Sequence, residues 1–157
     1  MRVMALDYGT RAIGVAISDE LKLTVRPLMT LRRERQSRAQ IIERIVALVS
    51  EYEAETLVVG LPLRMDGTIG DAAERVQRFI RELQGKLTIP VATCDERLSS
   101  READDILRER GADARQRRAR SDEIAAAIIL QDYLSAQAQH HETDIHGTES
   151  PEHLTHH

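Results

Sequence analysis

The sequence predicts an α/β fold in which a mixed five-stranded sheet is flanked by helices. Two observations lead to this prediction. Three short segments rich in valine, isoleucine and leucine come first, joined by links too short for a helical crossover. Further apolar strands then alternate with helical patterns, which is the order typical of parallel strands in a buried sheet. With 157 residues, of which 41% are hydrophobic, the chain is long enough for one well-formed core.

The first three strands are expected over residues 2–7, 12–18 and 24–30. Turn residues separate them, and such short links favour an antiparallel meander. A helix should follow, because Ser37 and Gln40 form a capping-box signature and the apolar residues after them recur at helical spacing.

The next segments alternate between strand and helix. Residues 56–61 form a continuously apolar strand. Asp71 and Glu74 should cap a second helix, which Gly85 ends. A fifth strand is expected over residues 88–94, and its internal proline indicates that this strand lies at an edge or starts late.

Two more helices should complete the domain, one over residues 99–111 and one beginning at Ser121, so the element order is βββαβαβαα. Residues 1–138 are therefore expected to form one domain, and residues 139–157 a disordered tail. The tail holds all six histidines and four acids but no lysine or arginine. Its polarity and low apolar content are typical of a solvated end.

The composition excludes several kinds of site from the expected domain. It has no histidine and one cysteine, Cys94, so a serine–histidine triad, a multi-cysteine zinc site and a disulfide framework have no residues there. No leader is apparent, and no segment approaches the roughly 20 uncharged residues that a membrane span needs. A cytoplasmic protein with no membrane association is expected.

The charges of the expected domain balance, because residues 1–138 hold 22 basic and 22 acidic side chains. Twenty of the bases are arginine, whose planar fork of donors suits phosphate. This bias indicates nucleic acid as a partner, or it reflects the base composition of the genome.

The position of Asp7 suggests a functional site, because this carboxylate interrupts an otherwise apolar strand. Such burial is costly unless the group is paired or binds a cation. In open α/β sheets, ligands gather beyond the C-terminal ends of the parallel strands. Asp7 and the pair Asp95–Glu96 should emerge at one such edge, and Asp122 in the first turn of the last helix could join them.

Carboxylates brought together in this way repel one another, and a hard divalent cation such as Mg²⁺ or Mn²⁺ is the usual remedy. Such clusters support metal-assisted cleavage of phosphodiester bonds. Each acid also has a purely structural explanation. Asp122 could simply stabilise the N-terminus of its helix, and Asp95 and Glu96 could be loop residues paired with Arg97.

Four ordered motifs resemble those of one known family. ALDYGTRAIGVAISD, VVGLPLRMDGTIG, CDERLSSREADDIL and SDEIAAAIILQDYL are similar to the motifs of the YqgF family, also called RuvX. That family is Holliday junction resolvase-like and is linked to maturation of the precursor of small-subunit ribosomal RNA. The resemblance runs from residue 1 to about residue 136. It implies a ribonuclease-H-like sheet of order 3-2-1-4-5 in which strand 2 is antiparallel.

The resemblance also implies roles for individual residues. Asp7, Glu96 and Asp122 match the metal-binding and catalytic acids of the family. The candidate phosphate-binding side chains are Thr10, Arg11, Arg64, Arg97, Ser99, Arg118 and Arg120. Two positions depart from the family pattern, because asparagine is usual where Arg64 stands and a lysine often precedes the final aspartate, where this chain has an arginine cluster.

The resulting hypothesis is a divalent-metal-dependent nuclease that processes the 5′ end of precursor 16S ribosomal RNA in ribosome biogenesis. Its partners would be structured RNA and ribosomal precursor particles, and it would act as a monomer or a homodimer. One alternative is a Holliday junction resolvase that cuts branched DNA. Another is a non-catalytic module that binds RNA or a transcription factor through the arginine-rich stretch RERGADARQRRAR.

A further alternative rests on the glycine turn in the first motif. This turn is also similar to the phosphate-binding hairpin of actin-like ATPases and sugar kinases. Those proteins clamp a nucleotide between two such domains, and 157 residues supply one. The nuclease hypothesis therefore fits the length of the chain better than ATP binding does.

Overall fold

The computed structural model describes residues 1–62, 69–95 and 122–138. Within these ranges the elements are β1 Arg2–Tyr8, β2 Ala12–Ser18, β3 Val25–Arg32, α1 Arg38–Glu51, β4 Ala54–Leu61, α2 Asp71–Gln84 and β5 Val91–Asp95. Residues 122–138 are helical as well and are called the C-terminal helix below. The predicted order is confirmed as far as β5. The expected helix over 99–111, the Ser121 cap and the tail 139–157 lie outside the described residues.

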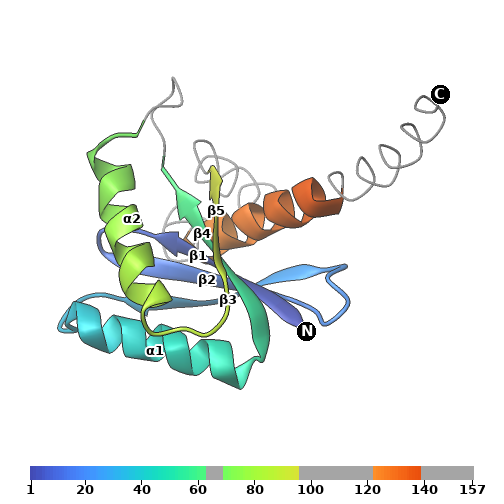
Figure 1. Ribbon diagram of the computed structural model, residues 1–157, viewed down its shortest axis with the longest axis horizontal. Coiled ribbons are helices and arrows are strands. Elements are labelled where there is room, and N and C mark those ends of the chain that lie inside the picture. Colours follow the sequence, from blue (N-terminus) through green and yellow to red (C-terminus); the bar gives the residue numbers. More distant parts are fainter. Residues whose placement is uncertain (63–68, 96–121, 139–157) are drawn as a thin grey trace, which may run out of the picture.

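The strands form one mixed sheet in the order β3-β2-β1-β4-β5, as predicted (Figure 1). β2 is antiparallel to β1 and β3, whereas β4 is parallel to β1 and β5. β1, β4 and β5 therefore end at the same side of the sheet, which we call the carboxyl edge. The proline before β5 has both expected effects, since β5 is an edge strand and begins only at Val91.

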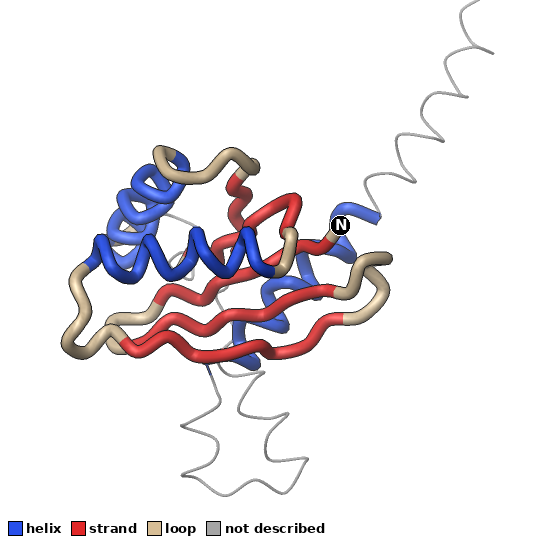
Figure 2. The backbone as a smooth tube through the Cα atoms, turned by 90° about the horizontal axis from the view of Figure 1, so that it is seen from below, coloured by secondary structure: helices blue, strands red, loops and turns tan. Residues whose placement is uncertain are grey.

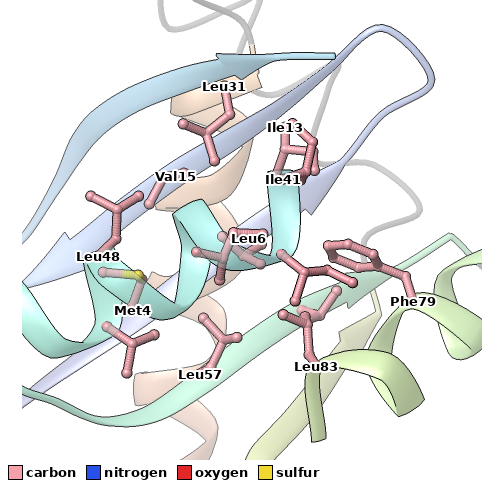
Figure 3. Packing of buried hydrophobic residues seen from close by; sticks show 14 of the residues in the cluster. Met4, Leu6, Ile13, Val15, Leu31, Ile41, Leu48, Leu57, Phe79 and Leu83 are labelled. Carbon is pink, nitrogen blue, oxygen red and sulfur yellow. The ribbon is translucent and has the colours of Figure 1, made fainter. Parts of the chain in front are cut away.

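Helices cover both faces of the sheet (Figures 1 and 2). One face packs against α1 and α2, and Figure 3 shows Met4 and Leu6 of β1 in this cluster with Phe79 and Leu83 of α2. The other face packs against the C-terminal helix; the buried residues of this second cluster are Val3, Ala5, Ala16, Val58, Ala126, Ile129 and Leu130. Because side chains alternate along β1, Asp7 belongs to the face of the C-terminal helix and Tyr8 to the face of α1 and α2.

The helix starts agree with the sequence in one case and differ in the other. At α1 the capping box is present. The backbone amide of Gln40 donates to the Ser37 hydroxyl at 3.2 Å, and the backbone amide of Ser37 donates to the side-chain carbonyl of Gln40 at 2.8 Å. At α2 the prediction that Asp71 caps the helix was wrong. Gly70 is the N-cap residue and Asp71 lies in the first turn, where its charge still favours the helix dipole.

No helix in the described part of the chain combines the length and the apolar character that crossing a bilayer requires.

Candidate functional site at the carboxyl edge

Asp7 lies at the carboxyl edge as the penultimate residue of β1. It is 9% exposed, and the residues that precede it in β1, such as Ala5 and Leu6, are fully buried. Its Cα partner on the antiparallel strand β2 is Gly14. The predicted burial of this acid is therefore confirmed, and its face is the one that the C-terminal helix covers.

Gly14 brings the C-terminal helix directly onto the strand beside Asp7. A Cβ atom at Gly14 would lie 2.8 Å from the Glu123 nitrogen and closer still to the carbonyl group of Asp122. Only a residue without a side chain allows the helix to approach the strand so closely. The first turn of the helix, which carries Asp122, consequently rests beside Asp7.

The position of Asp122 beside Asp7 affects the pKa of its carboxyl group. Burial raises the pKa of the Asp122 carboxyl, and the charges of Asp7 and Glu123 raise it further, whereas the Arg32 guanidinium lowers it. Geometry accounts for the effect of Asp7, because its strand partner Gly14 is the residue against which the backbone of Asp122 packs. The structure therefore brings together two of the three acids that the sequence analysis selected.

Glu123, next to Asp122 in the same helical turn, forms a hydrogen bond with the sheet at β3. Thr30 of β3 is the Cα partner of Gly14, and its hydroxyl donates to Glu123 Oε2 at 3.1 Å. Asp7, Gly14 and Thr30 thus form a row across three strands beneath the start of the helix. Sequence reasoning missed Gly14, Thr30 and Glu123. The available signal was a lone glycine inside an apolar strand, which often marks a close backbone approach.

The remaining predicted residues divide into two groups. Thr10 and Arg11 lie exposed in the turn between β1 and β2, at the carboxyl edge, and this turn is closed by a hydrogen bond from the Gly9 amide to the Ala12 carbonyl at 3.0 Å. The others lie outside the described residues: Arg64, Glu96, Arg97, Ser99, Arg118 and Arg120.

Asp95 is the last described residue of β5 and is the Cα partner of Leu61. Strand alternation gives it the same face as Val91, which packs with α1 and α2. Asp95 is thus on the face opposite Asp7. Within the described residues, no group of three or more histidine, cysteine, aspartate or glutamate side chains could hold a metal ion.

The chain matches the model of the RuvX family, described as "Holliday junction resolvase", over residues 1–136. The chain belongs to the RuvX family. Two curated relatives bear the name "Putative pre-16S rRNA nuclease". The one from Roseiflexus sp. (strain RS-1) is 47% identical over 136 residues, which cover 87% of this chain and 95% of the relative. The one from Syntrophus aciditrophicus (strain SB) is 46% identical over 139 residues, which cover 88% of this chain and 91% of the relative.

Solved structures similar to this RuvX chain include two resolvases. RuvC of T. thermophilus, in complex with a Holliday junction substrate, superposes with a TM-score of 0.56 at 15% identity, covering 88% of this chain and 96% of that one. The fowlpox virus Holliday junction resolvase superposes with a TM-score of 0.54 at 14% identity, covering 87% of this chain and 99% of that one. These similarities confirm the predicted ribonuclease-H-like fold.

The raised pKa of Asp122 makes the stability of the metal-free RuvX protein depend on pH. Between the ordinary pKa of 3.8 and the raised value, the folded state holds the Asp122 proton more tightly than the unfolded state does. Stability therefore falls as the pH rises through this window, and the ionised carboxylate lowers stability at neutral pH.

Asp122→Asn should consequently raise the melting temperature of the RuvX protein at pH 7 in the presence of a chelator. Asparagine keeps the shape of the side chain and its preference for helix N-termini, but it removes the buried charge. The difference from the wild type should shrink as the pH is lowered towards 3.8. Differential scanning calorimetry across this range measures both effects. A variant that melts below the wild type by the same amount at every pH would contradict the account.

Proposed function

We propose that this RuvX protein is a divalent-metal-dependent nuclease that hydrolyses phosphodiester bonds in precursor 16S ribosomal RNA. The observation that carries the proposal is the convergence of Asp7 and Asp122 at the carboxyl edge, where the backbone of Asp122 packs against Gly14, the strand partner of Asp7. The names of the curated relatives support the choice of substrate. Processing of ribosomal RNA would occur in the cytoplasm.

The residues present fit Mg²⁺ or Mn²⁺. Both ions prefer carboxylate oxygens, and a cation between Asp7 and Asp122 would relieve the repulsion between these two charges. When bound, a divalent ion supplies a more acidic water and stabilises the charge on the leaving oxygen. The protein contributes a site that the backbone holds rigidly, since Asp7 belongs to a central strand and Asp122 to a helix packed on that strand.

Glu96 is the proposed third acid. It follows Asp95, the residue at the end of β5 that strand alternation assigns to the opposite face. Glu96 is therefore a better candidate than Asp95 for the acid that joins Asp7. Its predicted contribution would be a further carboxylate oxygen to hold the ion.

Phosphate binding would come from side chains around the two acids. Thr10 and Arg11 occupy the exposed turn that follows β1, three and four residues beyond the buried carboxylate. An arginine fork can hold a backbone phosphate of the nucleic acid through two parallel hydrogen bonds. We propose that further phosphate contacts come from Arg64, Arg97, Ser99, Arg118 and Arg120.

The direct test compares two substrates with the same enzyme. In Mg²⁺ or Mn²⁺, the wild type should cleave a precursor 16S ribosomal RNA fragment near its mature 5′ end, and it should cleave a four-way DNA junction of similar length much more slowly. Light scattering on the same samples gives the size of the active species, because a junction-cutting enzyme needs two symmetry-related sites. Asp122→Asn and Glu96→Gln serve as inactive controls in both reactions.

The possible outcomes separate the candidate functions. Preferred cleavage of the junction by a dimer would replace the RNA proposal with a resolvase, the activity named in the description of the family. Tight RNA binding without cleavage in any divalent metal would instead identify a non-catalytic binding module. Cleavage of the RNA at the wild-type rate by both purified acid variants would overturn the site.

A further inference from the structure

The face of the sheet opposite Asp7 carries a basic pocket. It is a hollow of about 250 Å³ lined on its charged side by Arg33, Arg38 and Arg75, with Tyr8 and Thr10 beside them. Arg33 follows β3, Arg38 begins α1 and Arg75 lies in α2, so three separate elements bring their guanidinium groups to one place. We call this hollow the arginine pocket.

The side chains of Arg33 and Tyr8 are held in place by defined contacts. The Arg33 guanidinium lies over the Tyr8 ring, 4.6 Å from its centre, and donates to the Gly9 carbonyl at 2.6 Å. The Tyr8 ring in turn packs on Phe79 at 4.3 Å between ring centres. Because Phe79 is fully buried, Tyr8 and the arginine above it are anchored to the core.

Two of the three arginines of the arginine pocket form no ion pair in the described part of the chain. Arg38 pairs with Glu82 at 2.8 Å, but neither Arg33 nor Arg75 forms an ion pair there. The described residues that line the pocket include no aspartate or glutamate. Guanidinium groups without an ion-pair partner in a concave site favour the binding of anions.

The pocket is adjacent to the proposed nuclease site. Tyr8 directly follows Asp7 in β1, and the two side chains point to opposite faces of the same strand end. Thr10 lies in the turn that separates the two faces, and Arg33 fastens that turn because its amide donates to the Arg11 carbonyl at 3.0 Å. A polymer that crosses this turn can contact both sites at once.

We propose that the arginine pocket binds a phosphate group of the nucleic-acid substrate, next to the bond presented to Asp7. The inference rests on the proposed nuclease function for the identity of the polymer. The arginine fork matches the geometry of phosphate oxygens, and the Thr10 hydroxyl adds a further donor. The phosphate is either a backbone diester or the terminal group of a 5′-phosphorylated strand, because both present the same oxygens.

The test measures binding of a fluorescently labelled RNA to the full-length protein in the presence of a chelator, so that no cleavage occurs. Arg75→Gln removes one pocket charge from an exposed helix position and should leave the fold intact. Loss of one phosphate contact should lower the slope of log affinity against log salt by about 0.7 and weaken binding about fivefold at 0.1 M salt.

Arg78→Gln is the matched control. Arg78 is also exposed, lies in the same helix three residues later and does not line the pocket. Its substitution removes the same charge and should leave affinity and salt slope close to wild type. Equal losses in the two variants, or no loss in Arg75→Gln, would overturn the proposal.

Two RNAs of one sequence, with a 5′-phosphate and with a 5′-hydroxyl, identify the source of the phosphate. A loss confined to the 5′-phosphorylated strand assigns the pocket to a terminal phosphate, and equal losses assign it to a backbone diester. Cleavage by the wild type is scored separately in Mg²⁺ or Mn²⁺. A protein that binds RNA through Arg75 but never cuts would retain the pocket and refute the nuclease, so the two failures are distinguishable.

Discussion

Replacing Asp7 with asparagine should abolish phosphodiester cleavage while the protein stays folded. Asparagine preserves the size of the buried side chain at the end of β1, but it removes the negative charge that a divalent cation requires. Loss of an essential catalytic group typically lowers the rate by roughly 10³-fold or more. Single-turnover cleavage of the precursor RNA fragment at saturating Mg²⁺ or Mn²⁺ measures this loss directly.

A second readout on the Asp7→Asn variant is independent of activity. The wild type should gain thermal stability when Mn²⁺ or Mg²⁺ is added, because ligands that bind only the folded state stabilise it. The Asp7→Asn variant should show little of this gain. Asp132→Asn is the control, since Asp132 is exposed in the same C-terminal helix, about 15 Å along its axis from Asp122. Full activity in Asp7→Asn would refute the assignment of the site.

Adding a single methyl group at Gly14 should separate the two acids. In Gly14→Ala the new Cβ atom would overlap the carbonyl group of Asp122, and backbone atoms in a packed helix cannot rotate away as a flexible side chain can. The helix start must therefore move off β2. Overpacking of this kind costs about 1–3 kcal/mol of folding stability. A displacement of about 1 Å at a catalytic group can reduce the rate about 10²-fold.

Gly85→Ala is the matched control for Gly14→Ala. The same methyl group at Gly85 would meet its nearest neighbours at 3.5 and 3.8 Å, which is ordinary van der Waals contact. Gly85 has φ −70° at the end of α2, a conformation that alanine readily adopts. Calorimetry and cleavage rates on both variants check the prediction. If Gly14→Ala cuts as fast as the wild type, the close approach of helix and strand does not position the acids.

Much of the sheet could be predicted from the chain because its signals are local. Short links between three apolar segments favour a meander, and β1 to β3 form one. The capping box at Ser37 is formed by residues three positions apart, so the sequence contains it completely. The cap of α2 was missed because Gly70 offers no side chain to recognise, and Asp71 beside it has the residue type that caps usually have.

The site could be predicted only in part, for a similar reason. The burial of Asp7 follows from the apolar residues around it, which are its neighbours in the sequence. Asp122 was expected beside it from the resemblance to the family. The contact itself depends on a helix more than a hundred residues later packing on β2, and no local pattern encodes it. The arginine pocket was missed altogether, because Arg33, Arg38 and Arg75 come from three separate parts of the chain and each looks in the sequence like an ordinary surface arginine.

The sequence by itself determined the elements from β1 to β5, the antiparallel meander and the one carboxylate that an apolar strand would not otherwise contain. These features depend on hydrophobic periodicity and short-range caps, which act over a few residues. The tertiary structure decided which charges meet: Asp7 with Asp122 on one face of the sheet, and three arginines around Tyr8 on the other. Electrostatic interactions depend on distance in space, and only the packing of helices on both faces of the sheet sets those distances.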